Sequence, residues 1–352
     1  MNKILQIEDI EDGMIIDKPI YRDNGTLLVP GQTMVTHKLR YLLIHYGIFQ
    51  ASIKDSSNEV IEVDTEAMRE TIAIKIFNKE MEEVTENIKS RLLKFRKEGK
   101  SINLGELLKE ILKLFNVSHN NIQLINMMYC MSNHNNQVYV HSINVATMCK
   151  IMAKWLKFNE EDTRVLVLSG LLHDIGKLEV PQEIIEKVGD LTPREKELYN
   201  SHPYLGYIIV KDLIVDNRVK RAVYEHHERC DGTGYPDSLK EDQISDFSKI
   251  ISIIDTYDTM ITDKGDKKGV CPFKVIDILI NEGYKKYDTK YLVTFLEKIS
   301  ETYINRDVHL STGETGRIIM INKNDLSRPL VKVGDEFIDL SKEREITIEV
   351  IL

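Results

Sequence analysis

The chain has 352 residues, 42% of them hydrophobic, and a formal net charge of -9, which predicts a globular protein of two or three domains. This charge argues against duplex nucleic-acid binding, which needs clustered Lys and Arg, but it leaves room for a small anionic ligand beside divalent metals. No stretch approaches the roughly 20 apolar residues that cross a bilayer, and acids precede any signal-peptide region. We therefore expect a cytoplasmic protein without membrane insertion.

The first 55 residues are expected to form a small α+β domain. Short apolar runs flank Asn24-Gly25, which is a strong hairpin signal. A short helix is predicted in "THKLRYLLIHYG", ending at Gly47.

Residues 56–125 are expected to form a helical connector. A long helix is predicted from Asp64 to about Lys100, because apolar residues recur at helical spacing. This spacing favours homodimerisation through residues 66–98, with packing on the chain's own bundle as the alternative. The apolar positions are Ile72, Ile76, Met81, Val84, Ile88 and Leu92.

Helical patterns continue over residues 126–303 with short polar joints, which predicts an α-helical bundle. In residues 304–352 the pattern changes to alternating apolar and polar residues around glycine turns, as in "HLSTGETGRIIMIN" and "REITIEVIL". The predicted fold class is therefore mainly α, with a helical bundle core, a small N-terminal α+β domain and a small C-terminal β domain. Too few cysteines are present for a disulfide scaffold, so we expect reduced thiols at Cys130, Cys149, Cys230 and Cys271.

Histidines of the helical region occupy positions that are unusual for a core residue. His141 lies on an apolar stripe and, taken alone, is more simply read as a hydrogen-bonded core histidine. His173 ends the apolar run "VLVLSGLL" and is followed at once by Asp174, so burying both unpaired would cost several kcal/mol. His226 and His227 are adjacent, and neighbouring helical residues point about 100° apart, so both cannot face one apolar core.

A divalent cation would relieve the cost of burying these groups, because imidazole and carboxylate are the usual ligands for iron, manganese and zinc. Asp255 follows the apolar stretch "IISII", with a helix cap as the alternative interpretation. Together with His202, the histidines and inward carboxylates exceed what one tetrahedral ion needs, and they suit two. Two metals about 3.5 to 4 Å apart are a common device for in-line attack on phosphorus.

Two motifs, "LLHDIGK" and "HHERCDGTGYP", together resemble the HD-GYP family, a branch of the HD-domain phosphohydrolases that hydrolyse the bacterial second messenger cyclic di-GMP. "VHSINVA" upstream, "NSHPYLG" between them and "IDTYDTM" downstream extend the resemblance over about residues 126–300. The resemblance implies an HD-type helical bundle that acts as a metal-dependent phosphodiesterase on cyclic di-GMP. The flanking regions also resemble domains attached to such enzymes.

The resemblance implies a role for each matching residue. His141, His173, Asp174 and Asp255 would hold one metal. Asp174 would bridge to a second metal held by His202, His226 and His227. Lys177 would face a substrate phosphate as a point charge, and Asp174 and Lys177 are the predicted catalytic residues.

The loop after the paired histidines would shape the rim of the nucleotide site. Its predicted substrate-binding residues are Gly232, Gly234, Tyr235 and Pro236, with simple loop rigidity as the alternative. Family members often carry an Arg-Pro-Tyr-Arg stretch after the "DxYD" segment, where this chain has "DKGDKKG". Lys264 and Lys267 are expected to bind the substrate in place of those arginines, but without the bidentate fork of arginine.

Members with three metals carry Glu one helical turn before the first histidine, where this chain has Gln137. We therefore expect two divalent transition-metal ions, iron or manganese, and linear pGpG as the main product. The general acid is not identified by the sequence. The alternatives are a catalytically silent cyclic-dinucleotide receptor and an HD hydrolase of another cyclic dinucleotide.

Overall fold

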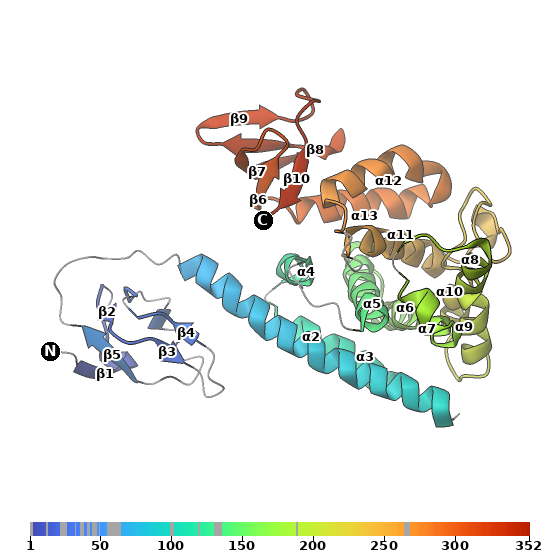
Figure 1. Ribbon diagram of the computed structural model, residues 1–352, viewed down its shortest axis with the longest axis horizontal. Coiled ribbons are helices and arrows are strands. Elements are labelled where there is room, and N and C mark those ends of the chain that lie inside the picture. The colour runs from blue at the N-terminus through green and yellow to red at the C-terminus, as the bar shows by residue number, and fades with distance from the viewer. Residues whose placement is uncertain are drawn as a thin grey trace. The chain divides into compact units, whose positions relative to one another are not determined.

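The structure is a computed structural model, drawn in Figure 1, in which the chain forms two compact units, Met1–Phe77 and Asn78–Leu352. None of the described helices is long and apolar enough to cross a membrane. The side chains of residues 3, 8, 27, 65–72 and 129 are outside the description. The described residues are 3–11, 13–21, 27–31, 33–35, 39–40, 43, 48, 50–54, 65–98, 102–118, 120–129, 136–187, 189–263 and 268–352.

The first unit is a small β structure around an isoleucine- and leucine-rich core that includes Ile7, Ile16 and Leu28. One sheet has the order β1-β5-β2, and β3 pairs antiparallel with β4. The predicted Asn24-Gly25 turn lies between β3 and β4 but outside the described residues, as does most of the predicted helix at 36–47. The bounds are β1 Lys3–Gln6, β2 Ile15–Ile16, β3 Ile20–Tyr21, β4 Leu27–Val29 and β5 Gln50–Lys54.

The predicted connector helix is α2, Thr65–Glu98. Its apolar side chains Met81, Val84, Ile88 and Leu92 are buried within a single chain. This burial agrees with the alternative interpretation, packing on the chain's own bundle, and gives no support to a dimer through this stripe. The domain limits stay a prediction, because compactness divides the chain inside α2.

The second unit is a helical bundle followed by a sheet (Figure 1). Polar caps start several helices: Asn159 accepts from the backbone of Asp162 at α6, and Thr192 with Glu195 forms a capping box at α8. The helices are α3 Leu104–Lys113, α4 Asn121–Tyr129, α5 Gln137–Trp155, α6 Glu160–Leu172, α7 Gln182–Ile185, α8 Pro193–Asn200, α9 His202–Val210, α10 Asn217–Glu225, α11 Asp246–Ile261, α12 Pro272–Lys286 and α13 Thr289–Glu301. Short 3₁₀ turns include η3, Ile175–Glu179.

The C-terminal sheet has the antiparallel order β10-β6-β7-β8-β9, and α12 and α13 contact it. Its strands are β6 Asp307–Leu310, β7 Thr315–Asn322, β8 Asp325–Val333, β9 Glu336–Asp339 and β10 Ile348–Ile351. The fold class predicted from the sequence is confirmed. Cys149, Cys230 and Cys271 are free thiols, as predicted, and Cys130 lies outside the described residues.

Polar contacts of α2 reach two segments that carry site residues. Asn136, directly before α5, accepts from Lys89 Nζ at 2.9 Å and donates to Glu86 Oε1 at 2.8 Å. Arg96 donates to both carboxylate oxygens of Glu179 in η3, at 2.7 and 3.3 Å. The connector helix therefore helps to place both α5 and η3.

Candidate metal centre

Histidine and aspartate side chains from five segments converge inside the bundle. The segments are α5, the junction of α6 with η3, the first residue of α9, the end of α10, and α11. Five of these side chains are buried, and those of His141 and His227 are partly exposed. The structure brings together every residue that the sequence analysis places at the two metals: His141, His173, Asp174, His202, His226, His227 and Asp255.

The first group consists of His141, His173 and Asp174, whose nearest ligand atoms lie within 4.8 Å of one another. Asp255 joins it from α11, since its Oδ1 lies 3.1 Å from His141 Nε2 and 3.9 Å from His173 Nε2. Asp255 is ten residues into α11, which ends at Ile261, so the alternative interpretation of Asp255 as a helix cap is wrong. The first group thus combines two imidazoles with two carboxylates.

The second group consists of Asp174, His202, His226 and His227. Asp174 Oδ1 lies 3.2 Å from His202 Nε2 and 3.6 Å from His226 Nε2. The Nε2 atom of His202 also lies 3.2 Å from His226 Nε2 and 3.1 Å from His227 Nε2. Asp174 belongs to both groups, as a ligand bridging two ions would.

Backbone carbonyls orient three of the imidazoles. His173 donates its Nδ1–H to Gly170 at 2.7 Å. His202 and His226 donate in the same way, to Tyr199 at 2.7 Å and to Val223 at 3.0 Å. Because each Nδ1 carries the proton, each Nε2 presents a lone pair to the centre, the arrangement that metal-binding histidines use.

His141 is held by a side chain instead. Its Nδ1–H donates to Asp258 Oδ2 at 2.7 Å, and Asp258 Oδ1 accepts from Asn144 Nδ2 at 3.2 Å. The sequence analysis did not single out Asp258. Its signal was the spacing of Asp255 and Asp258, which places both carboxylates on one face of the apolar helix α11.

Three buried ligand atoms of the centre have no hydrogen-bond partner among the described residues: His141 Nε2, His173 Nε2 and Asp174 Oδ1. Leaving such atoms unsatisfied costs about 1–3 kcal/mol each in a protein interior. A divalent cation would satisfy them, because the three side chains bring ligand atoms close together and His141 can release a proton on binding it. The residues present therefore fit a metal centre of nitrogen and oxygen ligands.

The charges of the two groups differ. Burial opposes ionisation of Asp174, but Lys177 and His173 outweigh it and hold its pKa well below the usual value. Burial also lowers the pKa of His141, yet Asp255 and Asp258 together raise it to about 10. In the second group burial lowers the pKa of His226 to about 4 and that of His227 well below 6.5. The first group thus gathers carboxylates around a basic imidazole, whereas His226 and His227 of the second group are neutral imidazoles.

Two glycines allow the HD segment to approach α9. A Cβ on Gly176 would lie 1.9 Å from the carbonyl oxygen of His202 and 2.4 Å from the backbone nitrogen of Gly206. No side chain fits in that space. Gly176 therefore lets η3 pack directly against the start of α9, which places Asp174 beside His202.

Lys177 lies beside Asp174. Its Nζ donates to Asp174 Oδ2 at 2.5 Å, and it lies 5.4 Å from the centroid of the Tyr199 ring. Burial alone would lower the pKa of Lys177, but Asp174 raises it. The ammonium is therefore charged and lies at the edge of the metal ligands, where the sequence analysis expects a substrate phosphate.

The GYP loop packs tightly against the second group. Gly232 has φ +78, and a Cβ on Gly234 would lie 2.4 Å from the backbone of residues 228–229. Glu228 accepts from the backbone nitrogens of Asp237 and Leu239, at 2.7 and 2.9 Å, and so fixes the loop. The Tyr235–Pro236 peptide bond is cis. These contacts explain the loop glycines by the packing of the loop. Their part in substrate binding stays a prediction.

Tyr235 closes the loop over the centre. Its ring stacks on His227, with centroids 4.7 Å apart and an interplanar angle of 27°. Burial raises the pKa of its hydroxyl. The loop thus shields one edge of the second ligand group.

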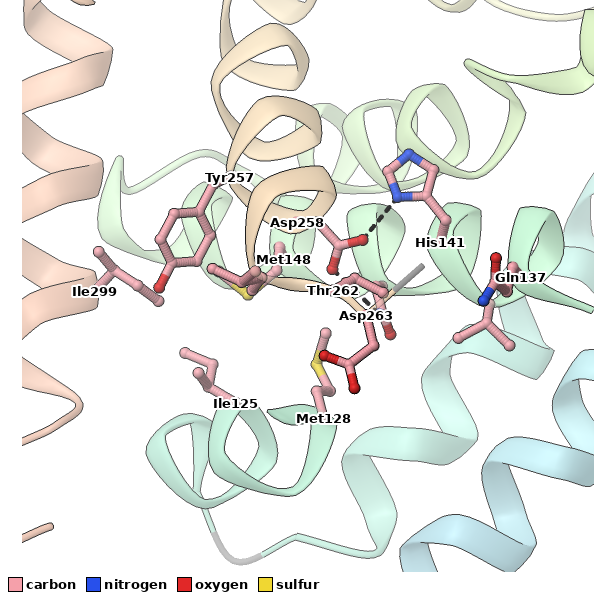
Figure 2. Close-up of a pocket in the computed structure, with 13 residues that line it drawn as sticks. Ile125, Met128, Gln137, His141, Met148, Tyr257, Asp258, Thr262, Asp263 and Ile299 are labelled. Atoms are coloured by element: carbon pink, nitrogen blue, oxygen red, sulfur yellow. Dashed lines mark hydrogen bonds and ion pairs between the residues drawn. The ribbon is translucent and has the colours of Figure 1, made fainter. Parts of the chain in front are cut away.

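A pocket of about 140 Å³ is lined in part by His141 (Figure 2). Its polar lining includes Gln137, His141 and Asp258, and its apolar lining includes Met128 and Met148. Gln137 begins α5 one turn before His141. Lys264 and Lys267, the predicted phosphate-binding lysines, lie outside the described residues.

Comparison with known proteins identifies the domain that carries these ligands. Residues 121–291 match the sequence family described as the HD domain. In the solved structures, the chain resembles Bd1817, an HDG"Y"P protein from Bdellovibrio bacteriovorus, with a TM-score of 0.50 and 18% identity over 85% of this chain and 99% of that one. At this identity the likeness concerns the fold alone.

Curated relatives match part of the chain. A cyclic di-GMP phosphodiesterase of Pseudomonas aeruginosa, PA4108, is 33% identical over 55% of this chain and 47% of its own length. The cyclic di-GMP phosphodiesterase PdeB of Borreliella burgdorferi is 30% identical over 54% of this chain and 51% of its own. A 3'3'-cGAMP-specific phosphodiesterase of Vibrio cholerae is 33% identical over 41% of this chain and 33% of its own.

The chain thus spans about half the length of the first two relatives. Residues 121–291 match the HD-domain family, and the resemblance of the sequence to its HD-GYP branch is confirmed.

Proposed function

We propose that this chain is a metal-dependent phosphodiesterase that hydrolyses cyclic di-GMP to linear pGpG in bacterial second-messenger signalling. One observation carries the proposal: two groups of buried imidazole and carboxylate ligands share Asp174, and three of their atoms lack a partner among the described residues. The names of the two cyclic di-GMP phosphodiesterases to which this chain is similar support the choice of substrate.

The proposed cofactor is a pair of divalent transition metals, iron or manganese. His141, His173, Asp174 and Asp255 would hold one ion, and Asp174, His202, His226 and His227 the other. When bound, such ions supply Lewis-acid stabilisation of the charge that develops during phosphodiester hydrolysis. Nitrogen and oxygen ligands of this kind suit both metals.

The chain's own residues would bind and orient the dinucleotide around the ions. Lys177 would place its charged ammonium against a phosphate oxygen, since it lies at the edge of the ligand set. The loop residues Gly232, Gly234, Tyr235 and Pro236 would form the rim of the site. Lys264 and Lys267 would add positive charge for a second phosphate.

Gln137 supports release of the linear product. Its neutral amide is a weak ligand where members with three metals carry Glu, so two ions are expected. The terminal phosphate of pGpG carries a charge near -2. With fewer positive centres to hold that phosphate, the linear product should leave before a second cut to GMP. Gln137→Glu should therefore increase GMP formation relative to pGpG.

The test is hydrolysis by the purified full chain, prepared anaerobically and supplied with iron or manganese, against cyclic di-GMP and 3'3'-cGAMP. Chromatography of the products should show pGpG from cyclic di-GMP at a higher rate than any product from 3'3'-cGAMP. Faster turnover of 3'3'-cGAMP would move the proposal to the other substrate, as the Vibrio relative allows. Binding of cyclic di-GMP without turnover would indicate a silent receptor. A cytoplasmic location and a homodimer stay proposals.

A further inference from the structure

His141 occupies a different kind of position from the histidines that backbone carbonyls orient. His173 and His226 are the C-cap residues of α6 and α10, and His202 follows Ser201, the C-cap residue of α8. The last carbonyls of a helix have no intrahelical partner, so each of these helix ends offers an acceptor for Nδ1–H. His141 lies in the second turn of the 19-residue helix α5, where the preceding carbonyls accept helical hydrogen bonds.

A buried carboxylate takes the place of that missing acceptor. Asp258 is 4% exposed and accepts from His141 Nδ1 at 2.7 Å, as the dashed line in Figure 2 marks. Asp258 is itself held by Asn144, which is 6% exposed and lies one turn after His141 on α5. The Asn144 Oδ1 atom is buried without a partner among the described residues, so the contact of this amide with a side chain there is its donation to Asp258.

The same helix reaches both nitrogens of the His141 ring. Asp255 Oδ1 lies 3.1 Å from Nε2, and Asp258 Oδ2 lies 2.7 Å from Nδ1. The two acids are one helical turn apart on α11. The ring is thereby fixed with Nε2 toward Asp174, whose Oδ2 is 3.5 Å away.

We propose that Asp258, held in place by Asn144, is a positioning residue that sets the tautomer and the orientation of His141 for metal binding. This inference rests on the proposed metal site. His141 of the first ligand group depends on a charged side chain, whereas His202 and His226 of the second group depend on backbone carbonyls. Partners of this kind contribute about 10- to 100-fold to metal affinity.

Whether one ion or both ions are weakened distinguishes this role from a structural one. If Asp258 only stabilised the packing of α5 on α11, its loss would lower the stability of the metal-free chain and weaken both ions together. If it positions His141, its loss weakens one ion and spares the other. Asp258→Asn keeps the shape and an acceptor oxygen but removes the charge, and Asp258→Val removes the acceptor as well.

The experiment is a manganese(II) titration of the metal-free full chain, with free manganese(II) measured by electron paramagnetic resonance. The wild type should bind two ions. Asp258→Asn should weaken one of them about 10-fold and Asp258→Val about 100-fold, with the second ion unchanged. Asn144→Ala should have a smaller effect on the same ion. Asp277→Asn, on α12 and outside the site, is the matched control.

Urea unfolding of each metal-free variant shows whether it is folded. Two unchanged ions in Asp258→Val, or an equal loss of both ions in Asp258→Asn, would overturn the positioning role while leaving the proposed function intact. A wild-type chain that binds no manganese(II) or iron(II) would instead overturn the proposed function, and this inference with it.

Discussion

The two ligand groups that share Asp174 orient their histidines in different ways. In the second group, backbone carbonyls orient His202 and His226. The first group places His141 between two carboxylates of α11. The carbonyls at a helix end can therefore orient a histidine ligand without any further side chain. A histidine ligand within a helix needs a polar side chain as the partner of its Nδ1–H.

The charge of each group follows from this construction. Carboxylates gather around His141 and raise its pKa, while burial among other imidazoles lowers the pKa of His226. In the metal-free protein the first group therefore holds a proton that a cation must displace. Binding of the first ion should accordingly release a proton and weaken at low pH.

The largest effect is expected at the residue that the groups share. Asp174→Asn removes the only carboxylate common to both groups among the described residues, so both ions should be lost and turnover should fall by at least about 1000-fold, the upper range for one electrostatic group. Elemental analysis and the hydrolysis assay measure the two effects. Full retention of one ion would mean that Asp174 serves one group alone, and Asp277→Asn should retain both.

A smaller loss is expected where a charge meets substrate rather than metal. Lys177→Ala should reduce turnover by about 100-fold, because one preorganised cation facing a phosphate is removed. The metal content of this variant should stay at the wild-type value. A loss of metal as large as that of His173→Ala would instead place Lys177 among the groups that hold Asp174 for the ions.

The pH dependence of stability should separate the groups without metal. His226 has a folded-state pKa of about 4, below the unfolded value of 6.5, so the stability it contributes is present above 6.5 and lost as pH falls toward 4. His141 has a folded-state pKa of about 10, so its contribution is present below 6.5 and lost as pH rises toward 10. The metal-free chain should therefore be most stable near pH 6.5 in urea unfolding.

Variants assign the two limbs of this profile. His226→Gln should flatten the acid limb, and His141→Gln the alkaline limb. A profile that both variants leave unchanged would show that these imidazoles do not control the stability of the metal-free chain.

The smallest effect is expected at the loop. Tyr235→Phe keeps the ring that stacks on His227, so metal content should stay constant and turnover should change by less than about threefold, as a single hydrogen bond allows. Tyr235→Ala uncovers the second group and should weaken the ion there more than the ion of the first group. The manganese(II) titration compares the variants, and a tenfold loss in Tyr235→Phe would assign the hydroxyl a direct part in substrate binding.

The sequence predicted the histidine ligands better than the groups that orient them. The pattern of an apolar run followed by His173 and Asp174 reflects a helix that ends at the site, and this signal is local. The pair of His141 with Asp258 joins residues 117 positions apart, which no periodicity in one chain can indicate. The contact depends on how α5 packs against α11, so it needed the structure.

The fold shows the same division between local and distant information. Helix starts such as those of α6 and α8 follow from their capping residues, and α2 agrees with its apolar spacing within a few residues. The helix-cap alternative for Asp255 was wrong, because "TYDTMI" keeps an apolar face and α11 continues to Ile261. An apolar run alone does not mark where a buried helix stops.

The most direct test of the central claim is the metal content of the chain purified anaerobically, measured by elemental analysis beside Asp174→Asn and Asp277→Asn. Two transition-metal ions per wild-type chain, two in Asp277→Asn and none in Asp174→Asn would agree with a shared dinuclear centre. A wild-type chain that holds no more than one ion after loading with iron(II) or manganese(II), or an Asp174→Asn variant that keeps both ions, would contradict it.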